Sequence, residues 1–136
     1  FLDEIIERFS PAEKYQKTII LGDFNIAPYE HDVWSHKQLL DVVSHTPIEV
    51  ERLMKLYKTQ NWIDTHRKFT PLAEKLYSWW SYRSKDWKLS NRGRRLDHIW
   101  ITPDLEENLT KAHIYPDARD FKSPSDHVPI SIDLDI

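Results

Sequence analysis

Apolar side chains recur along this chain at two spacings, and the wider spacing predicts two helices. The apolar residues of the segment 1–9 share one helical face, and we expect this helix to end at Ser10-Pro11. A second helix should begin at Thr46, where a proline follows the threonine and Glu49 completes the pattern of a helix cap. Its predicted apolar face consists of Val50, Leu53, Met54 and Tyr57.

Short runs of β-branched and aromatic residues predict the strands. Thr18–Leu21 is too short for a helix, so we interpret it as a buried strand that stops at Gly22. A loop from Pro28 to Trp34 and a short helix to about Val43 should follow. The polar segment Ser84–Arg94 should join two later strands as a hairpin. The predicted later strands are 77–82, 95–102, 112–115 and 128–134.

The order of these elements predicts an α+β fold with one largely antiparallel, mixed sheet and helices on one face. Hairpins and irregular loops connect the later strands, which disfavours a doubly wound nucleotide fold. With only two glycines, the chain lacks a glycine-rich phosphate loop. Its 136 residues suit one globular domain or part of one. Because the chain opens within a helical pattern and its only methionine is Met54, we expect it to be the middle of a larger protein.

Composition excludes several kinds of site without deciding the function. The chain contains no cysteine, which excludes disulfides, thiolate nucleophiles and cysteine-based metal sites. Its formal net charge of −3 argues against a generally basic surface for nucleic acid but not against a local basic patch. No apolar run approaches the roughly 18–20 residues of a transmembrane helix, so we expect no membrane association.

The first candidate chemistry stands at the end of the first strand, in Gly22-Asp23-Phe24-Asn25. If the chain stayed extended, Asp23 and Asn25 would point to the same side and converge. A carboxylate beside an amide at a buried strand end needs partners, which are often a metal, a phosphate or an activated water. Gly-Asp and Asn are also ordinary turn residues, so this segment alone slightly favours a turn.

Two more polar sites follow the same pattern of carboxylates near a strand end. Asp97 lies inside a strand-like segment, and Asp126 and His127 directly precede the last strand. A histidine between carboxylates can act as an acid–base or charge-stabilising pair, and a neighbouring acid could bind a hard cation. Taken alone, Asp97 would pair with a nearby arginine, Arg94 or Arg95. Asp126 could equally cap a turn, and an isolated His127 would more often be a structural histidine.

The remaining histidines are assigned no chemical role. His98 follows Asp97 directly and would point to the opposite face of the strand, so we do not expect it to be catalytic. The others show no spacing typical of a metal site and are interpreted as surface or packing residues: His31, His36, His45, His66 and His113.

Four segments together resemble a known family, the exodeoxyribonuclease III family of bacterial abasic-site endonucleases. They are Gly22–Pro28, Trp79–Ser84, Asn91–Asp97 and Ser125–Pro129, in the order in which that family carries them. The resemblance covers nearly the whole chain but only the C-terminal half of the family. It implies that residues 1–136 are the C-terminal half of an endonuclease/exonuclease/phosphatase domain, and therefore half of a four-layer α/β sandwich.

The resemblance also implies a role for each polar site. Asp23 would orient or deprotonate the attacking water with help from Asn25. His127, held by Asp97, would act on the scissile phosphate as a general base or by stabilising its charge. Asp126 would help to bind Mg²⁺ or Mn²⁺. These roles supply the positioning, proton removal and charge neutralisation that phosphodiester hydrolysis needs.

For the substrate, the resemblance implies double-stranded DNA with abasic sites. Trp79 would line the pocket for the flipped-out abasic sugar, although either Trp79 or Trp80 should be plain core because the two alternate. The segment 83–95 carries six basic residues and one acid, and within it Arg92 would contact backbone phosphate. Such a charge run is otherwise simply a solvated loop.

The activity implied is hydrolysis of the phosphodiester 5′ to an abasic site, with 3′-to-5′ exonuclease and 3′-phosphatase activity, in a bacterial, cytoplasmic and monomeric full-length protein. The family's N-terminal half supplies a metal-binding glutamate, an asparagine and a catalytic tyrosine that this chain does not contain. We therefore expect the chain alone to expose an apolar sheet face and to be essentially inactive. The alternatives are a lipid or inositol phosphodiesterase of the same superfamily and a non-catalytic DNA-binding fragment.

Overall fold

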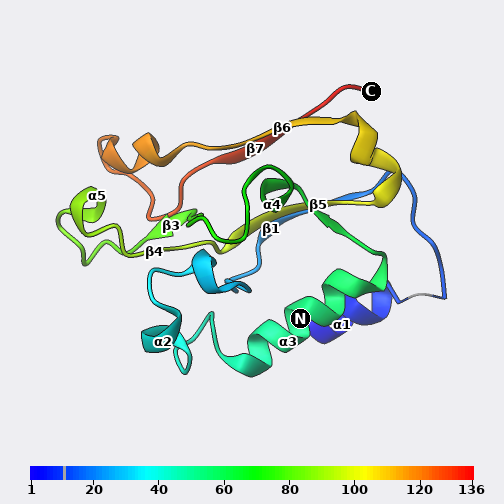
Figure 1. Cartoon of the computed structure of the whole chain (residues 1–136), viewed down its shortest axis with the longest axis horizontal. Helices are drawn as coiled ribbons and strands as arrows, with labels where there is room; N and C mark the ends of the chain where they lie inside the picture. The colour runs from blue at the N-terminus through cyan, green and yellow to red at the C-terminus, as the bar shows by residue number, and fades with distance from the viewer. Residues whose placement is uncertain (11) are drawn as a thin grey trace.

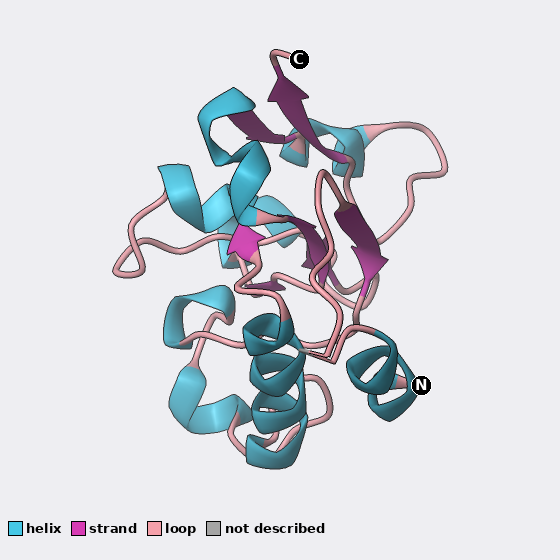
Figure 2. Cartoon of the chain, turned by 90° about the vertical axis from the view of Figure 1, so that its right-hand side faces the viewer, coloured by secondary structure: helices cyan, strands magenta, loops and turns pink. Residues whose placement is uncertain are grey.

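The protein is built in layers, with two packed helices beneath a set of short antiparallel strands (Figure 1). The structure is a computed structural model and describes residues 1–10 and 12–136. Helices α1 (Leu2–Arg8) and α3 (Pro47–Thr59) lie side by side below the strands. Figure 2 shows the same arrangement from the side, with the N-terminus at the helical layer and the C-terminus at the opposite end.

The strands form three short sheets, and all of their pairs are antiparallel. Strand β5 (Asp97–Ile101) lies between β1 (Ile19–Asp23) and β2 (Ile63–Asp64). Strands β3 (Trp79–Trp80) and β4 (Gly93–Arg94) form a pair. The predicted hairpin between 77–82 and 95–102 is wrong in its second strand, because β4 lies within the expected polar connection and β5 pairs with β1 and β2 instead. Strands β6 (Leu109–Ile114) and β7 (Ile130–Leu134) form the third sheet. The predicted α+β class and antiparallel pairing are confirmed, but the sheet is divided into three hydrogen-bonded parts.

The two predicted long helices are confirmed, and they bury the main apolar cluster. Thr46 and Glu49 form the expected capping box at the start of α3, which satisfies backbone N–H groups of the first turn. From α3, Leu53 and Leu56 are fully buried against Trp62 and Trp100. Leu56, which the sequence pattern did not single out, lies at the centre of this face. Pro11, where the first helix was expected to end, lies outside the described residues.

Short helices fill the connections and were mostly not predicted. The short helix expected after Trp34 is present as α2 (His36–Leu39). Helix α5 (Trp87–Ser90) stands in the expected polar connection, and α4 (Thr65–Phe69) lies in a segment for which no element was predicted. The 3-10 helices are η1 (Glu30–Asp32), η2 (Pro103–Asn108) and η3 (Pro116–Asp120). The side chains of Asp64 and Asp86 cap α4 and α5 by accepting backbone N–H bonds. Helices of four or five residues are too short to show an apolar period.

A buried cluster of charges, here called the Arg95 cluster, ties η1, α4, β2 and the start of β5 together. The guanidinium of Arg95 donates to both oxygens of Asp32 at 2.8 and 2.9 Å and to both oxygens of Asp64 at 2.9 and 2.8 Å. Arg67 adds a bond of 2.7 Å to Asp32. Burial alone would lower the pKa of Arg95, but the two carboxylates outweigh it and raise the pKa above its ordinary value.

Strand β1 presents apolar side chains on the face that also carries Asp23. Leu21 is 67% exposed and Ile19 is 39% exposed, and both alternate with half-buried neighbours. Among the residues that the structure describes, no helix has the length and apolar character needed to cross a membrane.

Candidate active site

Asp23 stands at the end of β1, and the register of the sheet brings it opposite Asp97, the first residue of β5. The backbone does not stay extended beyond it, because Asn25 adopts a left-handed conformation with φ of 53°. The backbone N–H of Asn25 donates to Asp23 Oδ1 at 2.8 Å. Residues 23–25 therefore form the turn that this segment alone slightly favoured, and not the extended geometry in which Asp23 and Asn25 would converge; the turn itself orients the Asp23 carboxylate.

Asp97 pairs with a histidine and a serine rather than with an arginine. Its Oδ2 accepts a bond of 2.9 Å from His127 Nδ1 and a bond of 2.7 Å from the Ser78 hydroxyl. The arginine partners that the sequence suggested are engaged elsewhere. Arg95 binds Asp32 and Asp64, and Arg94 donates to the Val43 carbonyl and the Ser44 hydroxyl. The alternative that Asp97 forms a local salt bridge is therefore wrong.

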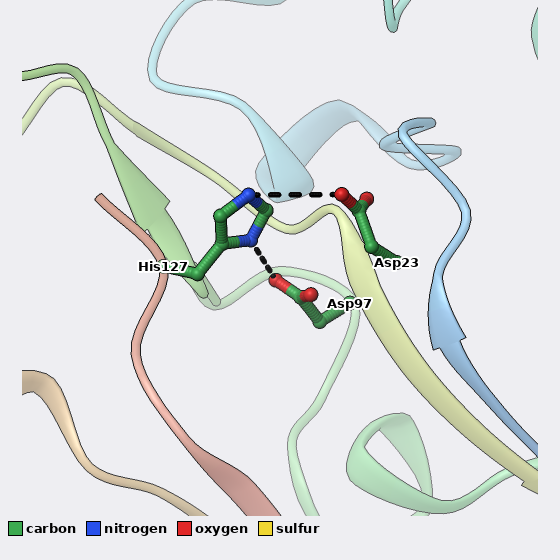
Figure 3. A group of neighbouring side chains, drawn as sticks. All are labelled: Asp23, Asp97 and His127. Atoms are coloured by element: carbon green, nitrogen blue, oxygen red, sulfur yellow. Dashed lines mark hydrogen bonds and ion pairs between the residues drawn. The ribbon is translucent and has the colours of Figure 1, made fainter. Parts of the chain in front are cut away.

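His127 lies between two carboxylates, as Figure 3 shows. Its Nδ1 faces Asp97, and its Nε2 lies 3.6 Å from Asp23 Oδ2. The backbone of the segment before β7 sets this position, because the His127 N–H donates to Ser125 Oγ and residue 127 forms a bridge with Trp79. The His127 side chain is 32% exposed, compared with 16% for Asp97 and 48% for Asp23. The ring is thus fixed from one side and accessible from the other.

The electrostatics of this group favour the charged imidazole. Partial burial alone would lower the pKa of His127, but the hydrogen bond to Asp97 and the charges of Asp97, Asp23 and Asp126 outweigh it. The pKa is therefore raised above its ordinary value of 6.5. An imidazolium between two acids can donate to, or stabilise charge on, an anionic group that approaches its exposed side.

Asp23, Asp97 and His127 could also hold a metal ion. One ligand atom from each lies within 4.8 Å of the others, and within the described part of the chain this is the group of three such residues that meets that condition. Carboxylate oxygens suit Mg²⁺, and a mixed oxygen and imidazole set also suits Mn²⁺. Because His127 Nδ1 already binds Asp97, the nitrogen left for an ion is Nε2, beside oxygens of Asp23 and Asp97.

Asp126, the residue expected to bind metal, lies outside that group. Its Oδ2 accepts a bond of 3.0 Å from the indole N–H of Trp79, and its backbone carbonyl accepts from the Trp80 N–H. The carboxylate therefore positions Trp79 and adds negative charge near His127. Its role as a metal ligand stays a prediction.

Trp79 and Trp80 divide as their alternation predicted. Trp80 is 4% exposed and packs in the core with Tyr77 and Trp87. Trp79 is half-buried, and the guanidinium of Arg94 lies 5.3 Å from its ring centre.

Beside Trp79, the guanidinium of Arg92 lies 4.7 Å from the ring centre of Trp34. An open cleft of about 730 Å³ lies at these side chains. It is lined by two tryptophans, three arginines and three serines: Trp34, Trp79, Arg83, Arg92, Arg94, Ser81, Ser84 and Ser90. The cleft thus combines aromatic rings with positive charge, as phosphate backbones and unstacked sugars require. Sequence reasoning missed Trp34 and Arg94, because neither carries a local signal beyond the basic run.

The sequence pattern of the endonuclease/exonuclease/phosphatase family matches residues 4–127, a span that includes Asp23, Asp97 and His127. The chain belongs to this family. Exodeoxyribonuclease III of Haemophilus influenzae is 36% identical over 124 residues, which cover 87% of the chain and 46% of that protein. The resemblance to the exodeoxyribonuclease III group is therefore confirmed.

Two solved structures share the fold of this chain. An AP endonuclease from Archaeoglobus fulgidus superimposes with a TM-score of 0.92 at 26% identity, covering 99% of the chain and 52% of that structure. A 3'-5' exonuclease from Neisseria meningitidis superimposes with a TM-score of 0.85 at 24% identity, covering 99% of the chain and 50% of that structure. The chain spans about half the length of these relatives.

Proposed function

We propose that this chain carries one side of the active site of a DNA repair nuclease that cuts the phosphodiester 5′ to an abasic site. On this proposal, the full-length protein also has 3′-to-5′ exonuclease and 3′-phosphatase activity, whereas the chain alone is inactive. The observation that carries the proposal is the position of His127, 2.9 Å from Asp97 and 3.6 Å from Asp23. Similarity to exodeoxyribonuclease III and to AP endonucleases supports the choice of substrate.

The proposed reaction assigns a task at the phosphate or the attacking water to each residue of the site. Asp97, itself held by the Ser78 hydroxyl, fixes the His127 ring and supports its charged form. The exposed Nε2 of His127 then stabilises negative charge on the scissile phosphate, or takes a proton if the ring is neutral. Asp23 orients the attacking water beside it, and Asn25 adds an amide at the same turn.

A divalent cation, which we propose to be Mg²⁺, would neutralise charge on the phosphate when bound. Oxygens of Asp23 and Asp97 would hold it from this chain, and Asp126 could contribute only if its bond to Trp79 leaves its second oxygen accessible. Water is a poor nucleophile at neutral pH, so this combination of positioning and charge is what the reaction requires.

The cleft beside Trp79 is the proposed contact for the abasic sugar and the flanking strand. The Trp79 ring would pack on a sugar that lacks its base, and Arg92 would bind a backbone phosphate. The same cleft argues against the alternative of a lipid or inositol phosphodiesterase. Alternating cationic and aromatic side chains suit a nucleic acid strand better than a single phosphorylated headgroup.

The test is Mg²⁺-dependent nicking of a duplex with a single abasic site, assayed with this chain and with a full-length protein that carries it. We expect the full-length protein to nick and His127→Ala to lower kcat by about 10²- to 10⁴-fold. His113→Ala is the matched control, since His113 is similarly exposed and also lies 3.6 Å from an aspartate, Asp133. It should retain full activity.

Three outcomes would contradict the proposal. Cleavage of a lipid phosphodiester in place of abasic DNA would favour the other branch of the superfamily. Binding of the duplex without any nicking would favour a non-catalytic DNA-binding protein. A His127→Ala variant within a few-fold of the wild type would remove His127 from the reaction.

A further inference from the structure

Two buried histidines on different elements bind the two backbone carbonyls that directly follow the 23–25 turn. His98 Nε2 lies 2.8 Å from the carbonyl oxygen of Ile26, and His45 Nδ1 lies 2.6 Å from that of Ala27. Both rings are almost inaccessible, with exposures of 0% and 2%. Neither residue belongs to the set proposed above for the reaction.

The chemistry of these bonds places a proton on one nitrogen of each ring. A carbonyl oxygen can only accept, so the ring nitrogen facing it must carry the proton. In neutral His45 the other nitrogen, Nε2, is then an acceptor, and His36 Nδ1 lies 2.7 Å from it. This arrangement requires His36 Nδ1 to donate to His45, which matches the tautomer in which His45 holds Ala27. The two histidines thus form a chain of hydrogen bonds from the start of α2 to the backbone beside the candidate active site.

His98 links the turn to the strand that carries Asp97. It is the next residue on β5 and lies opposite Gly22 in the register of β1 and β5. Its ring also stacks on Phe24, inside the turn, at 5.5 Å between ring centres. Adjacent side chains on a strand point to opposite faces, so β5 presents Asp97 to His127 and His98 to the turn. Strand β5 therefore helps to position both acids: it carries Asp97 itself, and through His98 it contacts the turn that holds Asp23.

The turn needs such support because its backbone is unusual and its continuation is buried. Asn25 is in the left-handed region, and Ile26 and Ala27 are 3% and 0% exposed. A buried carbonyl without a donor carries a large desolvation cost, so loss of either histidine would favour a rearranged turn that reaches water. Such a rearrangement would move Asp23, because the Asn25 N–H holds its carboxylate.

We propose that His98 and His45 form a carbonyl clamp whose function is to position the Asp23 carboxylate. The clamp rests on the proposed function for its effect on catalysis, but its effect on the turn does not. Both histidines are positioning residues, since neither touches the reacting groups. His66 provides a matched comparison: it is also buried, at 4% exposure, and also binds a carbonyl, that of His113 at 2.9 Å, on α4 and β6.

The first experiment measures the turn without any assay of activity. Amide hydrogen exchange at Asn25 is followed by NMR in the full-length protein, because this N–H is bonded to Asp23 Oδ1. We expect His98→Phe and His45→Phe, which keep a ring but lose the donor, to raise the exchange rate by 10-fold or more. His66→Phe should leave it unchanged. Unchanged exchange in both clamp variants would overturn the proposal.

Conservative variants separate the clamp from a general loss of packing. The amide of glutamine can replace a donor at Nε2, and that of asparagine a donor at Nδ1. We therefore expect His98→Gln to retain slow exchange better than His98→Asn, and His45→Asn better than His45→Gln. The opposite order at either position would contradict the assigned bond, and this comparison also serves if a phenylalanine variant does not fold.

The second experiment measures nicking of abasic duplex DNA by the same variants. We expect the phenylalanine variants of the clamp to lower kcat by about 10- to 100-fold with little change in KM, and His66→Phe to change neither. Faster exchange with unchanged kcat would show that the turn's position does not matter and would overturn the positioning role. If the wild-type protein does not nick at all, the proposed function fails, while the exchange result still decides whether the clamp exists.

Discussion

Two clusters of charge stand within two residues of each other on the chain, and they use similar components in opposite ways. The Arg95 cluster places one cation between Asp32 and Asp64, and the site places His127 between Asp97 and Asp23. Arg95 is 1% exposed and both carboxylates bind it through both oxygens, whereas His127 is one-third exposed and makes one close bond. The first cluster is saturated and permanently charged; the second keeps one face accessible and can change its charge.

This difference in burial and saturation predicts that the two clusters affect different measurements, one stability and the other activity. A saturated buried ion pair contributes to the fold, and removal of one partner leaves a buried charge uncompensated. A partly exposed pair contributes little to stability but controls the protonation state of the group that meets the substrate. Stability should therefore respond to the Arg95 cluster, and activity to the site.

The largest effect expected on stability comes from Arg95→Met. This change leaves two buried carboxylates without their main partner, and we expect the free energy of unfolding to fall by about 3–5 kcal/mol. Urea denaturation followed by circular dichroism measures it. A second change, Asp64→Asn in the Arg95→Met background, should recover part of the loss. A decrease below about 1 kcal/mol would show that the cluster is not a structural element.

A smaller effect on stability, but a large one on activity, is expected for Asp97→Asn. The amide keeps the shape of the side chain but loses the charge that raises the pKa of His127. We expect kcat for abasic nicking in the full-length protein to fall by about 10²- to 10⁴-fold. The free energy of unfolding should change by no more than about 1 kcal/mol. If this variant lost as much stability as Arg95→Met, the contrast between the two clusters would not hold.

The smallest effect expected is a difference in pH dependence. The pKa of His127 is raised in the folded protein, so its stabilisation is complete below the ordinary value of 6.5 and is lost as pH rises through the raised value. Burial alone would raise the pKa of Asp64, but Arg95 outweighs it and lowers the pKa. Its stabilisation is therefore present above the ordinary value of 3.8 and is lost as pH falls.

Unfolding curves between pH 3 and pH 9 would separate the two contributions. His127→Gln should remove the loss of stability on the alkaline side and leave the acid side unchanged. An unaltered profile for this variant would mean that the charged form of His127 is not favoured in the folded protein.

Local patterns predicted those parts of the structure that local forces determine. The capping box at Thr46 and Glu49 and the strand predicted at 18–21 follow from neighbouring residues; both are present, the strand as 19–23, one residue past the glycine where it was expected to stop. Strand β2 was missed because two residues, Ile63 and Asp64, show no alternation. The partners of Arg95 were also missed, since they lie 63 and 31 positions away and no single sequence reveals such pairs.

The candidate site was predicted through the order of its motifs rather than through its geometry. The pair of Asp97 and His127 was expected and is present. The sequence around Asn25 allowed two geometries: a turn, or an extended chain in which Asn25 would converge with Asp23. The structure shows the turn. His45 and His98 were assigned to packing or to no role, because an isolated histidine gives no signal of the carbonyl that it binds.

The register of β1 and β5 constrains how this protein can evolve. Asp23 lies opposite Asp97, so a one-residue insertion within either strand would turn one carboxylate to the other face of the sheet. The exposed loop 71–75, between α4 and β3, can change in length without moving either acid. We therefore expect lineages of this protein to vary in length at the loop 71–75, and to inherit strands 19–23 and 97–101 without gaps.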